Sequence, residues 1–497
     1  MGYNRPVKAF LANPPWRKGE RLGVRAGARW AFTMAAGKGS KIPPYVPFPF
    51  FLAYAAAVLE QAGIEVRLVD AIAEGMEAGP FLQEIADLVP DLVLLETSTP
   101  SIYSDLALSQ EIKRRVPTVR LALCGPHVSA LPVQTLEMAP AVDFVLVGEY
   151  EYTLRHLAAC LGEGEVAAHL RLDEVLGLAW RDADGRVRLN PRRPLIDKID
   201  ELPWPARHLL PMQRYRDNFA GLPMPGLQMW ASRGCPFHCI FCVWPRVMYG
   251  GHAYRARDPV DVVDEMEQTV QRYNLCSVSF DDDTFDIGKP RILRLCSEIR
   301  QRDLGLPWTA MARADTADRE MLEAMAGAGL YAIKYGVESG VQQLVDAAGK
   351  SLDLKRVKET VQITQDLGVK VHLTFTLGLP GETEETIRQT IDFASDMSAD
   401  SVQFSIATPY PGTTYYDMAE AGGMLVAQSW EDFDGADRAV LRTEALPPAK
   451  LEAALRRALR QWRWQHLRRT FWQRKGYYLR AGLKNPLRTI EILRGNM

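Results

Sequence analysis

The sequence predicts an α/β protein: an N-terminal doubly wound parallel sheet, then a partial (β/α)6 barrel, then a C-terminal helical region. Three observations predict this architecture. Short apolar strands alternate with helices in the first part, a second such series begins at Leu227, and the chain from Lys450 onward is helical and basic. A chain of 497 residues is long enough for two or three domains. We expect the domains to span residues 1–160, 161–224 (a connector), 225–430 and 431–497.

The first domain is built from short buried strands separated by helix-like segments. Strands are expected at 7–12, 65–69, 92–95, 121–124 and 144–147, and helices at 51–61, 81–88 and 105–115. This alternation predicts parallel βαβ units in one sheet. Ligands of such sheets bind beyond the carboxyl ends of the strands, and small or polar residues collect there in this sequence.

The connector contains one hairpin signal and one extended segment. Two short strands, 176–180 and 187–189, flank Asp184-Gly185, a dipeptide that favours a tight hairpin turn. The Pro-containing run 202–207 indicates an extended crossing between domains, because residues before proline avoid the helical conformation.

The second series has six strands, which is too few for a closed eight-stranded barrel. They are expected at 228–231, 277–280, 308–312, 332–335, 369–375 and 401–406, each followed by a helix-like stretch. In βα barrels the chemistry lies at the carboxyl ends of the strands. The unusual motifs of this half all follow a strand, so we expect them to meet at one edge.

The most specific of these motifs is the loop after the first strand, which contains Cys235, Cys239 and Cys242. Their CxxxCxxC spacing presents three thiolates to one inorganic centre. Iron–sulfur clusters are held by cysteine thiolates, usually four, so three predict a [4Fe–4S] cluster with one iron open to a ligand. A zinc site completed by His238 or a distant residue, or three unrelated thiols, are the alternatives; zinc sites prefer paired CxxC spacing.

Composition indicates an ordinary intracellular globular protein. The net charge of −2 gives no indication of nucleic acid as a partner, and the apolar run 48–59 is too short to span a bilayer. Seven cysteines without a signal-peptide pattern predict reduced thiols and a cytoplasmic location. The other four are expected to be buried as small hydrophobes: Cys124, Cys160, Cys276 and Cys296.

The C-terminal helical region interleaves arginines with aromatic residues. Its basic residues include Arg456, Arg457, Arg460, Arg463, Arg468, Arg469, Arg474 and Lys475, and its aromatic residues include Trp462, Trp464, Phe471 and Trp472. One interpretation is an amphipathic helix packed on the barrel with a solvated basic face. The other is contact with an anionic surface, either a membrane or the substrate.

With these motifs the chain resembles the radical S-adenosylmethionine (SAM) superfamily, in the branch that carries an N-terminal cobalamin-binding domain. An aromatic residue, Phe241, precedes the third cysteine as in that superfamily. The segments 336–340 (GVESG), 378–382 (GLPGE) and 409–413 (PYPGT) are typical of the branch, and Gly125-Pro126-His127 and Gly148-Glu149 resemble its N-terminal domain.

The resemblance implies how SAM is held and used. The open iron would chelate the amino and carboxylate groups of SAM, and an electron from the cluster would cleave it to a 5′-deoxyadenosyl radical. Asp281, Asp282 and Asp283 replace the Gly-Gly-Glu of many relatives; a carboxylate there can accept hydrogen bonds from the SAM ammonium, the alternative being a solvated acidic turn. The remaining expected SAM contacts are Glu338 at the ribose or methionine moiety, Ser339 beside it, and Gly378 to Pro380 at the adenine. Arg313 is expected to pair with the SAM carboxylate or with Glu338, the alternative being a structural ion pair.

The expected cobalamin domain departs from one known pattern. The Asp-x-His-x-x-Gly motif that supplies a histidine ligand to cobalt is missing, and His127 is interpreted as a loop histidine. Members of this branch bind cobalamin without that ligand. The residues expected to cradle the cofactor are Asn13, Thr97, Ser98, Thr99, Gly125 and Gly148.

The resemblance therefore predicts a cobalamin-dependent methyltransferase acting on an unactivated carbon. One alternative is a radical SAM enzyme that cyclises, dehydrates or rearranges its substrate without methylation. Another is a SAM- or cobalamin-sensing protein, against which the intact cysteine loop argues. Expected partners are a small-molecule or lipid-like substrate and an electron donor such as flavodoxin or ferredoxin, with membrane contact through the C-terminal helices as a further expectation. No catalytic residue beyond the cofactor ligands is assigned.

Overall fold

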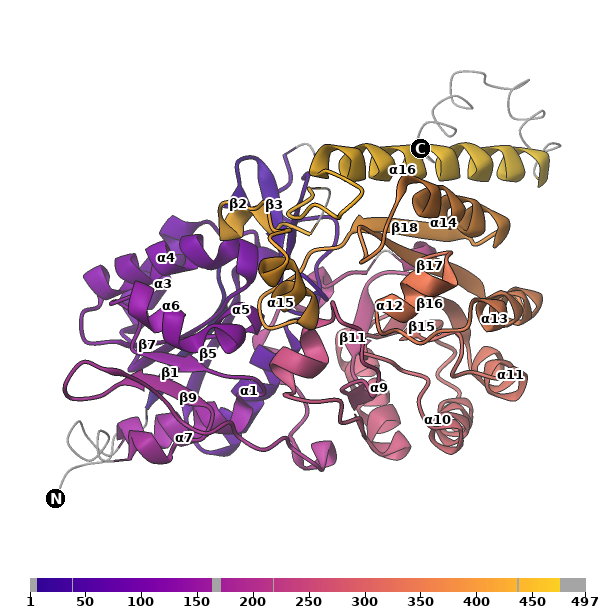
Figure 1. Cartoon of the computed structure of the whole chain (residues 1–497). Helices are drawn as coiled ribbons and strands as arrows, with labels where there is room; N and C mark the ends of the chain where they lie inside the picture. Colours follow the sequence, from indigo (N-terminus) through magenta and orange to yellow (C-terminus); the bar gives the residue numbers. More distant parts are fainter. Residues whose placement is uncertain (1–6, 38, 163–170, 218, 436–437, 474–497) are drawn as a thin grey trace.

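The computed structural model describes residues 7–37, 39–162, 171–217, 219–435 and 438–473. Two sheets stand side by side, each with its own helices, and a long helix, α16 (Pro448–Gln473), runs across the second one (Figure 1). The predicted doubly wound sheet and partial barrel are confirmed, and a C-terminal helix forms as far as Gln473. The rest of the predicted helical region, with Arg474 and Lys475, lies outside the described residues.

The N-terminal sheet has five parallel strands at its centre. They lie in the order β5 (Glu65–Asp70), β1 (Lys8–Asn13), β6 (Leu92–Glu96), β7 (Arg120–Cys124) and β8 (Phe144–Leu146). The five predicted strands are thus confirmed. The hairpin expected in the connector also forms, as β9 (Leu178–Arg181) and β10 (Val187–Leu189), and it pairs antiparallel with β8, so that it extends this sheet.

Alternate residues of each central strand enter two different cores. Phe10 packs with residues of α3 (Ala78–Leu88) and α4 (Ile102–Arg115), whereas Leu11 packs with residues of α1 (Phe50–Gln61) and α7 (Glu151–Gly162). Two-residue alternation therefore covers both faces of the sheet with helices. The strand order reverses between β1 and β6, and this switch point is where doubly wound sheets bind ligands.

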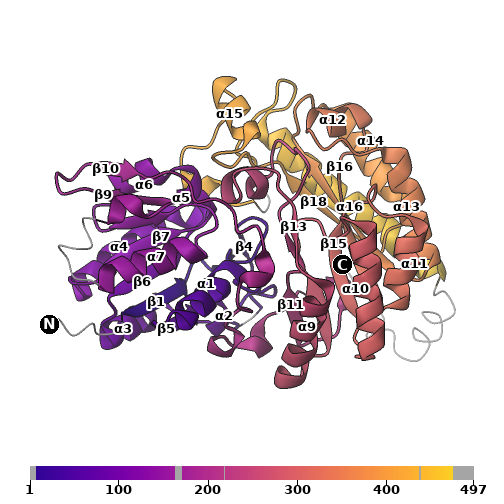
Figure 2. The same cartoon turned by 90° about the horizontal axis from the view of Figure 1, so that it is seen from below.

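The second sheet contains the six predicted parallel strands in sequence order. They are β11 (Gly226–Met229), β14 (Ser277–Phe280), β15 (Trp308–Ala312), β16 (Leu330–Glu338), β17 (Lys370–Leu377) and β18 (Ser401–Ile406). Figure 2 shows the helices α9 (Pro259–Tyr273), α10 (Lys289–Arg302), α11 (Arg319–Gly327), α13 (Leu354–Asp366) and α14 (Glu384–Asp396) along the outside. Because β11 and β18 are the two ends of the sheet order, the barrel is open.

Helix α1 joins the two domains. The rings of Phe50 and Trp230 stack with centroids 4.2 Å apart, and Phe51 stacks on Trp244 at 6.0 Å. Trp230 and Trp244 flank the cysteine loop, so aromatic packing from the N-terminal domain supports the cluster loop of the barrel. Aromatic pairs of this kind contribute about 0.5–1.5 kcal/mol each beyond simple burial.

A small antiparallel sheet after β1 was not predicted. It consists of β2 (Arg17–Lys18), β3 (Arg21–Val24) and β4 (Phe32–Met34), and the loop between β3 and β4 carries Arg25 and Arg29. Strands of two to four residues with mixed polarity give no readable alternation. This insert lies between the two domains.

Two further findings concern exposure and membranes. Cys276 is exposed, so the expectation that it is buried is wrong. It directly precedes the fully buried Ser277 at the start of β14, and successive side chains of a strand point to opposite sides.

Within the described ranges, no helix is long and apolar enough to cross a membrane.

Candidate cofactor sites at the domain interface

The cysteine loop begins with a turn that only glycine can make. Gly234 has φ +90°, and a Cβ there would lie 2.0 Å from the carbonyl oxygen of Ala253. Its backbone N–H donates to Asp283 Oδ2 at 2.9 Å. Further along, the N–H of Ile240 donates to the carbonyl of Ala348 at 3.0 Å. The barrel thus fixes the loop at both ends.

The three cysteines are half-buried thiols on this loop. Cys235 Sγ lies 3.2 Å from Thr284 Oγ1, and the N–H of Cys242 donates to the carbonyl of Cys239 at 3.2 Å. Burial raises the pKa of the Cys239 and Cys242 thiols, so a metal charge is needed to hold them as thiolates. This donor set fits an iron–sulfur cluster.

The zinc alternative gains no support from the geometry. Among the described residues, no three His, Cys, Asp or Glu side chains converge closely enough to hold a single metal ion. The ring of His238 packs against that of His252, with centroids 3.9 Å apart. Three thiols spread along a loop suit a cluster of several irons better than one ion.

Two members of the acidic triplet support the loop directly. Asp282 is fully buried and accepts hydrogen bonds from the Ala231 N–H (3.2 Å) and the Ser232 hydroxyl. Asp283 accepts from Gly234 and pairs with Arg29, while Asp281 lies 4.0 Å from Arg29. The alternative of a solvated acidic turn is therefore wrong. Contact with the SAM ammonium stays a prediction.

Glu338 lies in a strained conformation at the end of β16. Its φ is +72°, beside a bulge in the pairing with β17. Oε1 accepts from Lys350 Nζ at 2.8 Å and Oε2 accepts from the Thr376 hydroxyl at 2.7 Å. Backbone strain of this kind in a non-glycine residue is often found at functional sites. The position of Glu338 suits a ligand contact, which stays a prediction.

Lys350 is a site residue that the sequence did not reveal. Its burial would lower its pKa, but the negative charges of Glu338 and Cys239 outweigh this and raise the pKa of Lys350. It follows a short helix, α12 (Gln342–Ala347), in a stretch without a recognisable motif. Only the fold brings its ammonium group next to the cluster loop.

Arg313 forms a structural ion pair, the alternative weighed for it, rather than a pair with Glu338. Its guanidinium pairs with both carboxylate oxygens of Asp315, at 2.9 and 2.8 Å, and lies 3.5 Å from the ring centroid of Phe237 in the cluster loop. The expected pairing with Glu338 is wrong, because Lys350 already occupies that carboxylate. Arg313 therefore braces the cluster loop, and contact with the SAM carboxylate stays a prediction.

The remaining barrel residues shape turns. Ser339 is fully buried, with Oγ 3.1 Å from Thr390 Oγ1 in α14. Gly378 has φ +92°, and its N–H donates to Glu382 Oε2 at 3.2 Å. The partly exposed Pro380 follows in the same turn. Their proposed contacts with SAM are not tested by these hydrogen bonds.

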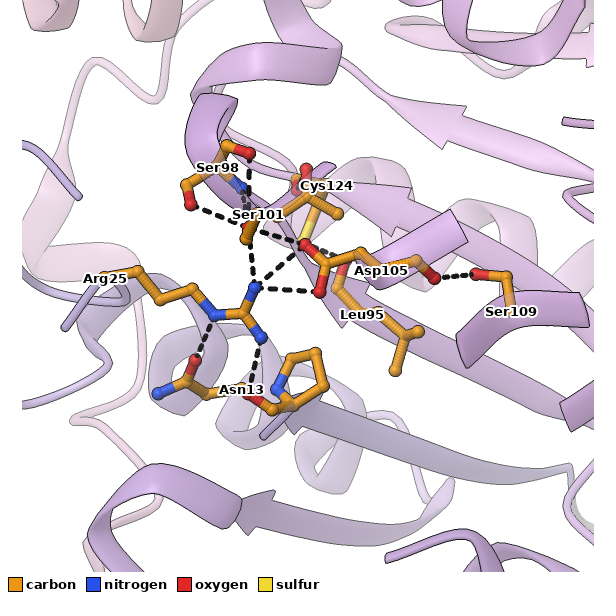
Figure 3. A network of polar contacts seen from close by, with 10 residues as sticks. Asn13, Arg25, Leu95, Ser98, Ser101, Asp105, Ser109 and Cys124 are labelled. Carbon is orange, nitrogen blue, oxygen red and sulfur yellow. Dashed lines mark hydrogen bonds and ion pairs between the residues drawn. The ribbon is translucent and has the colours of Figure 1, made fainter. Parts of the chain in front are cut away.

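At the N-terminal strand ends, Arg25 is the centre of a buried network (Figure 3). Its guanidinium donates to Asn13 Oδ1 at 3.0 Å, the Ser101 hydroxyl at 2.8 Å and both oxygens of Asp105 at 2.8 Å. Asn13 in turn donates to Asp70 Oδ1 at 2.8 Å. Both the oxygen and the nitrogen of the Asn13 amide therefore have a partner inside the protein.

The other predicted cradle residues also bond to neighbouring loops. The Thr97 hydroxyl donates to the Cys124 carbonyl at 2.9 Å, Ser98 Oγ is 2.8 Å from Ser101 Oγ, and Thr99 Oγ1 is 3.3 Å from His127 Nδ1. His127 belongs to the first turn of α5 (Pro126–Ala130) and not to a loop; burial lowers its pKa to about 4.

Two glycines are required where these strands end. Gly125 has φ +109°, and a Cβ there would lie 2.3 Å from the Thr97 carbonyl. Gly148 has φ +74°, and its N–H donates to the Ser129 hydroxyl at 3.0 Å. Both bring backbone close to the edge where a ligand of this sheet would lie.

One small cavity of about 40 Å³ lies between the two strand-end edges. From the N-terminal domain it is lined by 96–100 and Pro126, from the insert by 25–31, and from the barrel by Val243, Trp244, Tyr410 and Pro411. Val243 directly follows the third cysteine. Thr97, Ser98 and Thr99 thus face the same hollow as the end of the cluster loop.

Buried ion pairs hold the two edges together. Arg233, next to Gly234, pairs with Glu149 at 3.2 Å and Glu151 at 2.7 Å, and Arg255 pairs with Glu149 at 2.8 Å. Arg29 reaches from the insert to Asp283. Since removing one partner of a buried pair leaves an uncompensated charge, these contacts fix the relative position of the domains.

Comparison with known proteins agrees with this geometry. A family model for the radical SAM superfamily matches residues 231–394, and one for the B12 binding domain matches residues 43–158. The chain is 31% identical over 410 residues to an uncharacterised methyltransferase of Pyrococcus horikoshii, covering 82% of this chain and 86% of that protein.

The chain belongs to the radical SAM superfamily, in the branch with a B12-binding domain. Its cofactors are accordingly a [4Fe–4S] cluster, SAM and cobalamin. The fold of this radical SAM enzyme resembles that of the methyltransferase TsrM of Kitasatospora setae, with a TM-score of 0.65, 19% identity, and coverage of 85% of this chain and 76% of that one.

A second relative of the enzyme is named as a cyclase and not as a methyltransferase. It is the anaerobic magnesium-protoporphyrin IX monomethyl ester cyclase of Rubrivivax gelatinosus, 29% identical over 373 residues, with coverage of 73% of this chain and 64% of that protein. Relatives in this branch thus include both a methyltransferase and a cyclase.

Proposed function

We propose that this enzyme transfers a methyl group to an unactivated carbon of a small-molecule or lipid-like substrate. The observation that carries the proposal is the single cavity shared by the B12-binding strand ends and the end of the cluster loop. When bound, the cluster and SAM supply a substrate-derived radical, and cobalamin supplies the methyl group. Both need access to one substrate, and the two strand-end edges face the same hollow.

The chain's own residues would bind the cofactors, orient the substrate and exclude water from the cavity. Cys235, Cys239 and Cys242 would hold the cluster, with the backbone turn at Gly234 fixing their loop. Trp244 and Tyr410 wall the cavity on the barrel side and would shield reactive species from water. Thr97 to Thr99 would line the cobalamin side.

The proposal includes a reductant and a cellular location. A small electron-transfer protein such as flavodoxin or ferredoxin would reduce the cluster. The cytoplasm would keep the seven cysteines reduced. We do not expect nucleic acid as a substrate, because the overall charge of −2 offers no general attraction for it.

Transfer of a labelled methyl group tests the proposal without knowledge of the substrate. The anaerobically reconstituted enzyme is incubated with reductant and SAM carrying a trideuterated methyl group, and bound cobalamin is extracted for mass spectrometry. We expect trideuteromethyl cobalamin together with 5′-deoxyadenosine. Formation of 5′-deoxyadenosine with unlabelled cobalamin would instead favour the non-methylating alternative, for which the cyclase relative is the supporting observation.

A further inference from the structure

The charge of this protein is distributed very unevenly along the chain. Residues 448–497 contain 13 Lys and Arg but only two acidic residues, whereas the whole chain contains 59 Lys and Arg and 61 Asp and Glu. The rest of the protein is therefore clearly acidic, and the excess positive charge is concentrated at one end. Such asymmetry indicates an anionic partner for the basic segment.

Helix α16 presents part of this charge on an exposed face. Five arginines are exposed there, together with the indole of Trp464, which is 69% exposed. The five are Arg456, Arg457, Arg460, Arg463 and Arg468, here named the arginine face. Members three or four positions apart repel one another on a helix, which costs stability unless something neutralises them.

The arginines of the arginine face lack the ion pairs that other arginines on the described barrel surface form. Arg294 pairs with Asp258 at 2.9 Å, Arg302 with Asp264 and Glu267 at 2.5 Å, and Arg388 with Glu385 at 2.6 Å. Within the described part of the chain, no member of the arginine face forms an ion pair. Its positive charge is thus available to a partner.

Only the first half of α16 is anchored to the barrel. Leu451, Leu455 and Ala458 are buried, and α16 packs along α14 and β18. Beyond Trp462, which is partly buried, the described side chains are mostly exposed. In Figure 1 the helix runs along α14 and β18, and no residue of α16 lines the cavity between the two strand-end edges. The arginine face therefore cannot belong to the cofactor cavity.

We propose that α16 docks this enzyme on an anionic phospholipid bilayer. Each basic residue near an acidic membrane surface contributes a similar amount to the binding free energy between protein and membrane. Exposed indole side chains bind at the level of the lipid headgroups. An exposed tryptophan among arginines matches this chemistry. A flat bilayer can also touch the projecting helix while the acidic remainder of the protein stays in solution, whereas a long nucleic acid would meet that acidic surface.

Vesicle co-sedimentation of the full-length enzyme tests the proposal. The probes are vesicles of phosphatidylcholine alone and of phosphatidylcholine mixed equally with phosphatidylglycerol. We expect binding to the mixed vesicles only, with affinity that falls as salt rises. The triple variant Arg456→Gln/Arg460→Gln/Arg463→Gln should bind roughly a hundredfold more weakly, at about fivefold per arginine. Gln keeps the helix propensity of Arg, so the helix should persist.

A control variant with the same change in net charge tests whether vesicle binding depends on the arginine face or only on the net charge of the protein. Arg294→Gln/Arg302→Gln/Arg388→Gln removes two exposed arginines and one half-buried arginine, Arg302, from other helices and should bind mixed vesicles like the unmodified enzyme. Equal weakening of both triple variants, absence of binding to mixed vesicles, or equal binding to neutral vesicles would overturn the proposal. So would tighter binding to RNA or duplex DNA, or displacement by inorganic phosphate beyond that by chloride at equal ionic strength. These outcomes do not depend on methyl transfer, so the two proposals fail separately.

Discussion

The two strand-end edges that meet at the cavity differ in how their polar groups are used. At the barrel edge, burial raises the pKa of the Cys239 and Cys242 thiols, which need a metal to stay ionised, and Lys350 lies beside Cys239. At the N-terminal edge, Asn13, Ser101 and Asp105 already satisfy one another around Arg25. One edge is chemically incomplete without its cofactor, while the other is a prepared surface of backbone and small side chains.

The largest expected effect is at the incomplete edge. Cys239→Ala removes one of three cluster ligands and should abolish formation of 5′-deoxyadenosine, because SAM needs the open iron. Iron content and the visible absorption of the anaerobically reconstituted variant provide the measurement. Cys276→Ala, at the exposed cysteine, is the matched control and should retain both. Full iron content and activity in the Cys239 variant would refute the cluster assignment.

The next largest effect is expected for the buried ion pair beside the cluster. Lys350→Met leaves the Glu338 carboxylate buried without its partner, which should cost about 3–5 kcal/mol in the free energy of unfolding. Adding Glu338→Leu should restore much of that loss. Denaturant unfolding measures both, with the exposed Lys355→Met as control. A Lys350 variant as stable as the control would show that this pair does not matter to the barrel.

A pH effect is expected from Glu96 at the N-terminal edge. Burial raises the pKa of Glu96 from 4.5 to about 7, so the folded protein keeps a proton that the unfolded chain loses. The contribution of Glu96 to the free energy of unfolding therefore falls by at most about 3 kcal/mol as pH rises from about 4.5 to about 7. Above about pH 7 this contribution is constant. In Glu96→Gln this fall should disappear, which unfolding of the cobalamin-free protein at pH 5 and pH 8 would reveal. The exposed Glu444→Gln should keep the pH dependence of the unmodified protein; the same dependence in Glu96→Gln would contradict the prediction.

The smallest of these effects is expected for cofactor retention at the N-terminal edge. Arg25→Met combined with Asp105→Leu removes the centre of the network that orients the strand ends without leaving a buried carboxylate unpaired, and should weaken cobalamin binding about 10- to 100-fold, as when groups that orient ligands are lost. Iron content should be unchanged, which separates the two edges. The exposed Arg17→Met is the control. Loss of iron and cobalt together would mean that the two edges form one cooperative unit.

The same contrast explains what the sequence could predict. The cysteine spacing and the alternation of strands and helices are local signals, and both were correct. Lys350, Arg29 and the Glu149 ion pairs come from segments distant in sequence, and only packing of the two domains brings them together. For Arg313 the pairing with Glu338 is wrong and the alternative of a structural ion pair is correct, with Asp315 two residues away as the partner. Asn13 and Thr97 to Thr99 were correctly placed at strand ends, yet sequence alone does not show that their side chains bond within the protein.

The most direct test of a two-cofactor interface is to count both metals in one sample. The full-length enzyme is reconstituted anaerobically with iron, sulfide and hydroxocobalamin, passed through a desalting column, and analysed for iron and cobalt. We predict four irons and one cobalt per chain, since a [4Fe–4S] cluster and a single corrin would occupy the two edges. Iron without cobalt would contradict the account, leaving a radical SAM enzyme whose first domain has another role.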